Sequence, residues 1–163
     1  MLNSSQFVLD YIKQNDTSLN INNKKLLFKG SHCGWNNICD YNKKNILIII
    51  ESDNDYIFGV YAQKGFGFYG SKKKDDKTFL FSANLSKIYP AIKNINDIGY
   101  YIYPIKYDDG LCFTGSVYLY LNYYIRYIKS KIKQYFYGLD NIYEMNGGKR
   151  KFRIKKIEVY EFL

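Results

Sequence analysis

Residues 46–61 read ILIIIESDNDYIFGVY, and this stretch decides the fold class. Its first five residues, Ile46–Ile50, form an unbroken apolar run, which is typical of a strand buried on both faces. Ser52–Asp55 then supplies residues that favour turns, and Tyr56–Tyr61 returns as a second apolar strand. The stretch therefore predicts an antiparallel hairpin that is buried at the centre of a sheet.

Further strand-like segments lie on both sides of the hairpin, and they do not alternate with helices. This order is typical of antiparallel sheets packed face to face. Aromatic residues make up 19% of the chain and support this interpretation, because flat rings pack well on pleated surfaces. We predict a mainly β (α+β) fold, a β-sandwich of two antiparallel sheets with a few short peripheral helices. The other predicted strands are residues 24–29, 78–82, 100–103, 117–121, 151–154 and 156–162.

The last two predicted strands contain an anomaly in the spacing of their apolar residues. Phe152 and Ile154 share one parity, whereas Ile157 and Val159 share the other, so a straight strand would put the two pairs on opposite faces. A bulge or bend near Lys155 would return all four side chains to the core. The sequence Asn-Gly-Gly at 146–148 predicts a tight turn before these strands.

The first 23 residues predict a short helix and a polar loop, packed on a single domain that spans residues 24–163. Residues 4–14 suit an amphipathic helix, with Ser4 or Ser5 as its N-cap. One face of this helix is apolar and carries Phe7, Val8, Tyr11 and Ile12.

The chain carries neither a secretory signal nor a membrane-spanning stretch that sequence alone can identify. Its N-terminus has no basic start, Asp10 interrupts the first apolar segment, and Ile46–Ile50 is far too short to cross a bilayer. We therefore expect a cytoplasmic protein with reduced cysteines, and we take it to be a monomer.

Six segments between Lys24 and Leu163 follow, in order, the strand motifs of a known family. They are 25–31 (KLLFKGS), 46–51 with 58–61 (ILIIIE and FGVY), 77–82 (KTFLFS), 110–119 (GLCFTGSVYL), 136–138 with 143–144 (FYG and YE) and 157–161 (IEVYE). This set resembles the TLDc domain of the oxidation-resistance protein family. The resemblance implies a two-sheet antiparallel β-sandwich without established catalytic chemistry. It also implies a link to protection from oxidative damage and, as in several relatives, binding to subunits of the vacuolar proton pump at an organelle membrane.

Two segments depart from the family pattern. The glycine-rich stretch keeps only Gly110 and Gly115, and residues 122–135 replace a loop that is polar in family members. This replacement puts in doubt whatever the family does through that loop.

Residues 122–135 form the first candidate binding segment, because Arg126, Lys129, Lys131 and Lys133 have no acid nearby. As a helix the segment would be basic and amphipathic, which suits an anionic membrane or an acidic groove. The same residues partly alternate, which would suit an edge strand guarded by lysines. An element packed on the sandwich with its charges in water is the simpler interpretation of either form.

Residues 65–74 form the second candidate binding segment. Gly65–Gly70 matches G-x-G-x-x-G, but a strand follows so soon that the helix needed to bind a pyrophosphate has no room. Lys72, Lys73 and Lys74 can touch phosphate or an acidic partner, or simply be solvated.

Neither a metal site nor a catalytic group is predicted. His32, Cys33 and Cys39 lack the paired spacing of structural zinc ligands, and the chain has no second histidine. We expect buried, inert thiols, no cofactor and no enzymatic activity.

Two functional hypotheses follow from these observations. The first is a non-enzymatic domain that binds a protein partner. The second is a basic module that binds nucleic acid or an anionic membrane through residues 122–135, as the net charge of +9 permits. The candidate binding residues are Lys72, Lys73, Lys74, Arg126, Lys129, Lys131 and Lys133.

Overall fold

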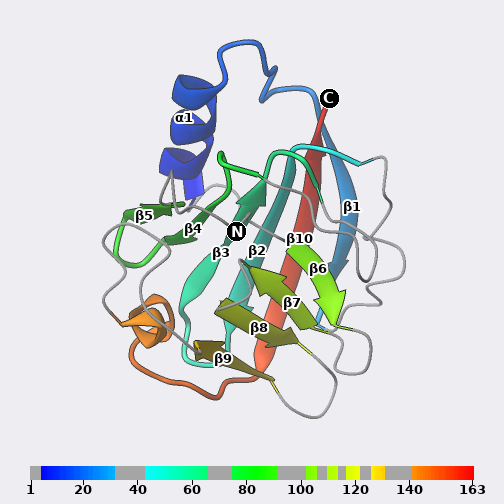
Figure 1. Cartoon of the computed structure of the whole chain (residues 1–163). Helices are drawn as coiled ribbons and strands as arrows, with labels where there is room; N and C mark the ends of the chain where they lie inside the picture. Colours follow the sequence, from blue (N-terminus) through cyan, green and yellow to red (C-terminus); the bar gives the residue numbers. More distant parts are fainter. Residues whose placement is uncertain are drawn as a thin grey trace.

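The computed structural model describes residues 5–31, 43–65, 75–91, 102–105, 110–113, 117–121, 126–130 and 141–163. Twelve elements lie in these ranges (Figure 1). They are α1 (Gln6–Asn15), β1 (Lys24–Gly30), β2 (Ile46–Ser52), β3 (Ile57–Ala62), β4 (Phe79–Ser82), β5 (Lys87–Pro90), β6 (Ile102–Ile105), β7 (Gly110–Phe113), β8 (Val117–Leu121), β9 (Arg126–Ser130), the 3-10 helix η3 (Ile142–Asn146) and β10 (Ile154–Phe162).

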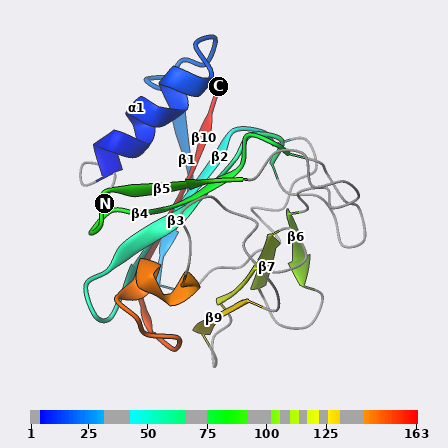
Figure 2. The ribbon, with the colours of Figure 1, turned by 60° about the vertical axis from the view of Figure 1, so that its left-hand side comes forward.

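The strands form two antiparallel sheets, so the predicted mainly β class is confirmed. The first sheet has the order β1-β10-β2-β3-β4-β5, and the second has the order β6-β7-β8-β9. The second sheet lies over one face of the first, and α1 lies on the other side (Figures 1 and 2). Among the described residues, no helix is long and apolar enough to cross a membrane.

Both faces of β2 are buried, as its unbroken apolar run predicts. Ile46, Ile48 and Ile50 belong to the core cluster on the face of the second sheet, together with Phe152 and Val159. Leu47 and Ile49 belong to the opposite cluster, into which α1 inserts Val8, Leu9 and Ile12. The hairpin of β2 and β3 is therefore the common wall of two cores.

The predicted bulge in the last strand is confirmed. Against β2, Ile154 pairs with Ser52 and Lys156 pairs with Glu51, so Lys155 is the extra residue. Phe152, Ile154, Ile157 and Val159 consequently all lie in the same core cluster. The strand begins only at Ile154, because the backbone of Arg153 bonds to Asp53 in the turn and not to the ladder.

Both prolines lie in outermost strands of the described sheets. Pro90 is in β5 and Pro104 is in β6. A proline has no backbone N–H, so these positions leave the interior ladders intact. The sequence prediction did not include β5, and it ended the strand at Tyr103, before Pro104, whereas β6 runs through Pro104 to Ile105.

The N-terminal helix agrees with its predicted position and apolar face. Ser5 occupies the N-cap, but its side chain makes no capping hydrogen bond. Tyr11 packs edge-on against Phe79, with 5.0 Å between the ring centres, and Phe7 packs similarly against Phe81. The helix is therefore held by aromatic packing on β4.

Candidate interaction surface

A run of basic residues follows η3, and it begins from a rigid turn. Asn146 is fully buried; it accepts a hydrogen bond from Ser52 Oγ at 2.7 Å, and its Nδ2 donates to Lys149 O at 3.0 Å. Gly147 has a φ of 61°, and a Cβ there would lie 2.5 Å from the Tyr56 ring. The turn is therefore fixed to the β2–β3 hairpin, and only glycine fits at its centre.

The chain leaves this turn as an extended segment with alternating burial. Phe152 and Ile154 are 6% and 5% exposed, whereas Lys151 and Arg153 are exposed. The Phe152 ring packs edge-on against Phe58, with 5.4 Å between the ring centres. Two hydrogen bonds hold Arg153: its N–H donates to Asp53 Oδ1 at 3.1 Å, and its carbonyl accepts from Asp53 N at 2.9 Å. The backbone that carries Lys151 and Arg153 is therefore held in place by the buried side chains on its other face and by Asp53.

Some of the cations at this end of the molecule already have anionic partners. Lys155 Nζ lies 2.8 Å from Asp55 Oδ1 and 3.0 Å from Glu51 Oε1, and Lys156 Nζ lies 2.8 Å from Glu158 Oε1. The hydrogen bond from Lys155, with its charge, lowers the pKa of Asp55, and the same contacts raise the pKa of Lys155. Lys149, Lys151 and Arg153 make no ion pair with the described part of the chain.

The structure places part of the predicted segment 122–135 against η3, which precedes this run in the chain. Arg126 and Lys129 fall on β9, where they pair in register with Leu121 and Tyr118 of β8. Residues 126–130 therefore adopt the strand alternative, at the outer end of the second sheet, and β9 contacts η3 (Figures 1 and 2). Lys131 and Lys133 lie outside the described residues.

Lys72, Lys73 and Lys74 lie outside the described residues, but the base of their loop is described. Asp75 is buried there and accepts hydrogen bonds from Lys64 N at 2.8 Å and Lys77 N at 3.1 Å. This base adjoins the Ala62 end of β3, whereas η3 is bonded to the hairpin turn at the start of β3. The base of this loop and η3 therefore adjoin opposite ends of β3.

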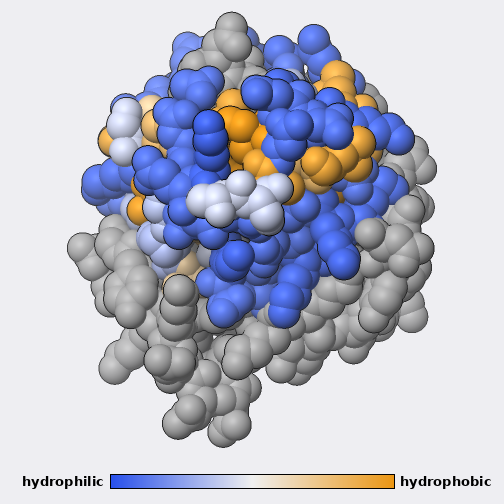
Figure 3. Space-filling model, turned by 90° about the horizontal axis from the view of Figure 1, so that it is seen from above, coloured by the Kyte–Doolittle hydropathy of each residue, from blue (hydrophilic) through white to orange (hydrophobic). Residues whose placement is uncertain are grey.

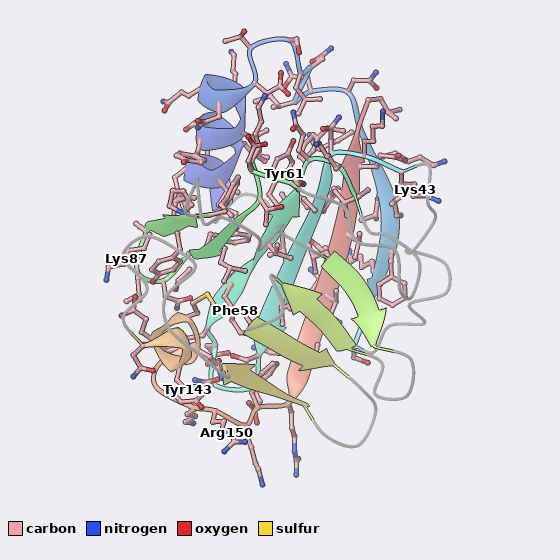
Figure 4. All side chains as sticks on the ribbon, in the orientation of Figure 1. Lys43, Phe58, Tyr61, Lys87, Tyr143 and Arg150 are labelled. Carbon is pink, nitrogen blue, oxygen red and sulfur yellow. The ribbon has the colours of Figure 1, made fainter. Side chains whose placement is uncertain are left out.

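Figure 4 shows the two ends. Tyr143 and Arg150 lie at the lower end with η3, and Tyr61 and Lys43 lie toward the upper end. Seen from above, the upper end shows hydrophobic residues ringed by hydrophilic ones (Figure 3). A pocket of about 520 Å³ lies at this end, lined by Asp16, Ser18, Leu19, Lys44, Asn45, Gln63, Lys64 and Leu163.

The polar groups of the upper pocket hold elements together. Gln63 Nε2 donates to Asp16 Oδ2 at 2.9 Å, and Lys77 Nζ lies 3.8 Å from the same oxygen. The hydrogen bond from Ser18 is the main cause of the lowered pKa of Asp16. These contacts join the end of α1 to β3 and β4, so we assign the pocket a structural role.

All three residues considered for a zinc site are beyond what the structure describes. His32, Cys33 and Cys39 lie outside the described residues, and Cys112 lies on β7. No group of three or more His, Cys, Asp or Glu side chains is close enough to hold a metal within the described ranges.

The basic run itself is not among the predicted binding residues, although its signal in the sequence is plain. Residues 149–156 read KRKFRIKK, six cations in eight residues. A cluster of this density is a recognised sign of a surface that binds acidic ligands. The parity of Phe152 and Ile154 predicts which side of this segment is buried, but it assigns no role to the cations on the exposed side.

A comparison with protein families gives one match. The family model described as TLDc domain matches residues 6–163, which is nearly the whole chain and includes α1. No curated protein matches the chain.

Proposed function

Since the chain belongs to the TLDc domain family, we propose that it is a non-enzymatic protein-interaction domain of the oxidation-resistance type. Its partner would be a subunit of the vacuolar proton pump, and its place would be the cytoplasmic surface of the organelle that carries the pump. Its role would be to regulate that pump under oxidative stress.

The family match over nearly the whole chain is the observation that carries this proposal. The basic run at 149–156 adds to it, because an exposed charged surface on a fixed backbone suits recognition of a protein partner. The neighbouring strand β9 contributes Arg126 and Lys129 to the same end of the molecule.

The second candidate function is binding of nucleic acid or an anionic membrane through residues 122–135. The observation in its favour is that β9 contacts η3, the element from which the basic run 149–156 continues along the chain. Such binding would weaken steeply with added salt, because a polyanion releases counterions when it is neutralised.

The two functions separate in one binding experiment that offers the chain purified proton-pump subunits, single-stranded DNA and anionic lipid vesicles. The native chain is compared with a variant that carries Gln at positions 126, 129, 131 and 133. A matched control carries Gln in place of Lys13, Lys24, Lys25 and Lys29, which are exposed elsewhere. Retention of a pump subunit by the native chain at moderate salt supports the first function. Retention of only nucleic acid or lipid, released by salt and by the first variant alone, supports the second.

A further inference from the structure

Three cations on the basic run are displayed together without anionic partners among the described residues. Lys149, Lys151 and Arg153 are exposed. Phe152, between Lys151 and Arg153, is buried, whereas Arg150, between Lys149 and Lys151, is exposed as well. We propose that these three residues form a docking strip for an acidic, extended segment of a partner protein. The proposal rests on the protein-interaction role given above and names the chemistry of that partner.

The spacing of the cations on the docking strip determines the spacing of acidic residues that a ligand needs. Lys151 and Arg153 lie two residues apart in an extended segment, so their Cα atoms are about 6.6 Å apart at the usual strand rise. Carboxylates on alternate residues of an extended peptide have the same spacing. A segment with acidic residues at alternate positions therefore places one carboxylate opposite Lys151 and one opposite Arg153. Lys149, which lies before the bend at position 150, adds a further positive charge at one end of the segment.

The docking strip is held in place before any partner arrives. Phe152 and Ile154 fix the inner side of the segment in the core, and Asp53 fixes the backbone of Arg153 by two hydrogen bonds. Asn146 fixes the backbone of Lys149. Less backbone entropy is then lost on binding, which raises the affinity that the exposed ion pairs can give.

The surroundings of the docking strip favour a peptide over a polyphosphate or a lipid surface. Asp53 and Asp55 are exposed beside it, and Glu51 adjoins Lys155. Nucleic acid and anionic bilayers carry closely spaced phosphates, which would be brought against these carboxylates. A protein segment can instead place neutral or basic residues opposite Asp53 and Asp55, so it satisfies both signs of charge.

The test is a titration of the full chain with defined probes. The first probe is a synthetic peptide with glutamate at three alternate positions and serine between them, and the second has the same composition with its glutamates contiguous. A single-stranded DNA of equal charge and phosphatidylserine vesicles are the competing ligands. The double variant Lys151→Gln, Arg153→Gln is compared with Lys24→Gln, Lys25→Gln, which changes the net charge equally at the far end of β1.

We expect the alternating peptide to bind more tightly than the contiguous one, and the double variant to weaken it roughly tenfold, as two exposed ion pairs allow. The control should change the affinity less than about twofold. Thermal unfolding of both variants checks that they are folded. The proposed role of the docking strip would be overturned if the two peptides bound equally. It would also be overturned if DNA or vesicles bound more tightly, or if no peptide bound at all.

The same double variant separates this inference from the proposed function. If it still retains a pump subunit as well as the native chain does, the docking strip is wrong and the proposed function stands. If the native chain retains no pump subunit but prefers the alternating peptide, the choice of the pump as partner is wrong and the docking strip stands.

Discussion

The Tyr89 hydroxyl donates a hydrogen bond of 2.6 Å to Glu144 Oε1, and this bond joins β5 to η3. Lys87 Nζ lies 3.5 Å from the same oxygen. We predict that Tyr89→Phe lowers the free energy of unfolding by about 1–2 kcal/mol, since a bond to a charged acceptor is lost while Lys87 still accompanies the carboxylate. Denaturation in urea measures the loss. An unchanged midpoint would mean that the bond does not contribute to stability.

Alkaline pH should destabilise the fold from about the pH at which an exposed tyrosine titrates, because two tyrosines have a raised pKa in the folded state. Burial, together with the hydrogen bond to Glu158, raises the pKa of Tyr160 to about 12 from its usual 10.0. Burial and the bond to Glu144 likewise raise the pKa of Tyr89. The folded state keeps these protons longer than the unfolded state, so their stabilisation is complete below pH 10 and is lost as the pH rises toward about 12. Urea midpoints across this window should fall, and less steeply for Tyr160→Phe.

Two glycines should respond very differently to alanine. At Gly59 a Cβ would lie 1.9 Å from Ile48 O and 2.8 Å from the Phe81 ring, so Gly59→Ala should cost more than about 3 kcal/mol. At Gly148 nothing lies within 4 Å, and only the φ of +81° opposes a side chain, so Gly148→Ala should cost about 1 kcal/mol. Thermal unfolding compares the two. Similar costs would contradict the close approach of β2, β3 and β4.

Deleting Lys155 should be far more damaging than replacing it. Lys155→Ala removes two exposed ion pairs and should change stability little. Deletion removes the bulge and puts Phe152 and Ile154 on the face opposite Ile157. The deletion should lower the free energy of unfolding by more than a Phe152→Ala substitution would, which is about 3–5 kcal/mol. Circular dichroism of the purified variants decides this, and a folded deletion variant would show that the register is set elsewhere.

Asn146→Ala should weaken peptide binding without removing a charge. The substitution breaks the bonds to Ser52 and Lys149 within the core, at a cost of about 2 kcal/mol, and frees the start of the docking strip. Affinity for the alternating peptide should therefore fall in a titration, whereas Asn20→Ala in the exposed α1–β1 loop should leave it unchanged. Native affinity in the first variant would show that the backbone restraint is irrelevant to binding.

Local patterns in the sequence were sufficient for the central hairpin and for the bulge. Ile46–Ile50 has no polar residue to face water, and the parity change at Lys155 has only one solution that buries Phe152 and Ile154. The surface could not be predicted in the same way, since it depends on contacts between distant residues. Ser52 and Asn146 are 94 positions apart, yet their hydrogen bond fixes where the basic run begins. The contact between β9 and η3 likewise depends on the tertiary structure, and it cannot be deduced from the spacing of residues within 122–135.

The position of β10 has a consequence for the order in which this domain is completed on the ribosome. Within the described sheets β1 pairs with β10 alone, and β10 also separates β1 from β2. The β2–β3 hairpin can form as soon as it emerges, because its two strands are close in the chain. β1 is synthesised before all other strands but must wait for the last of them. The nascent chain therefore carries the edges of β1 and β2 unpaired until translation reaches Phe162, and this interval is when a chaperone would be needed.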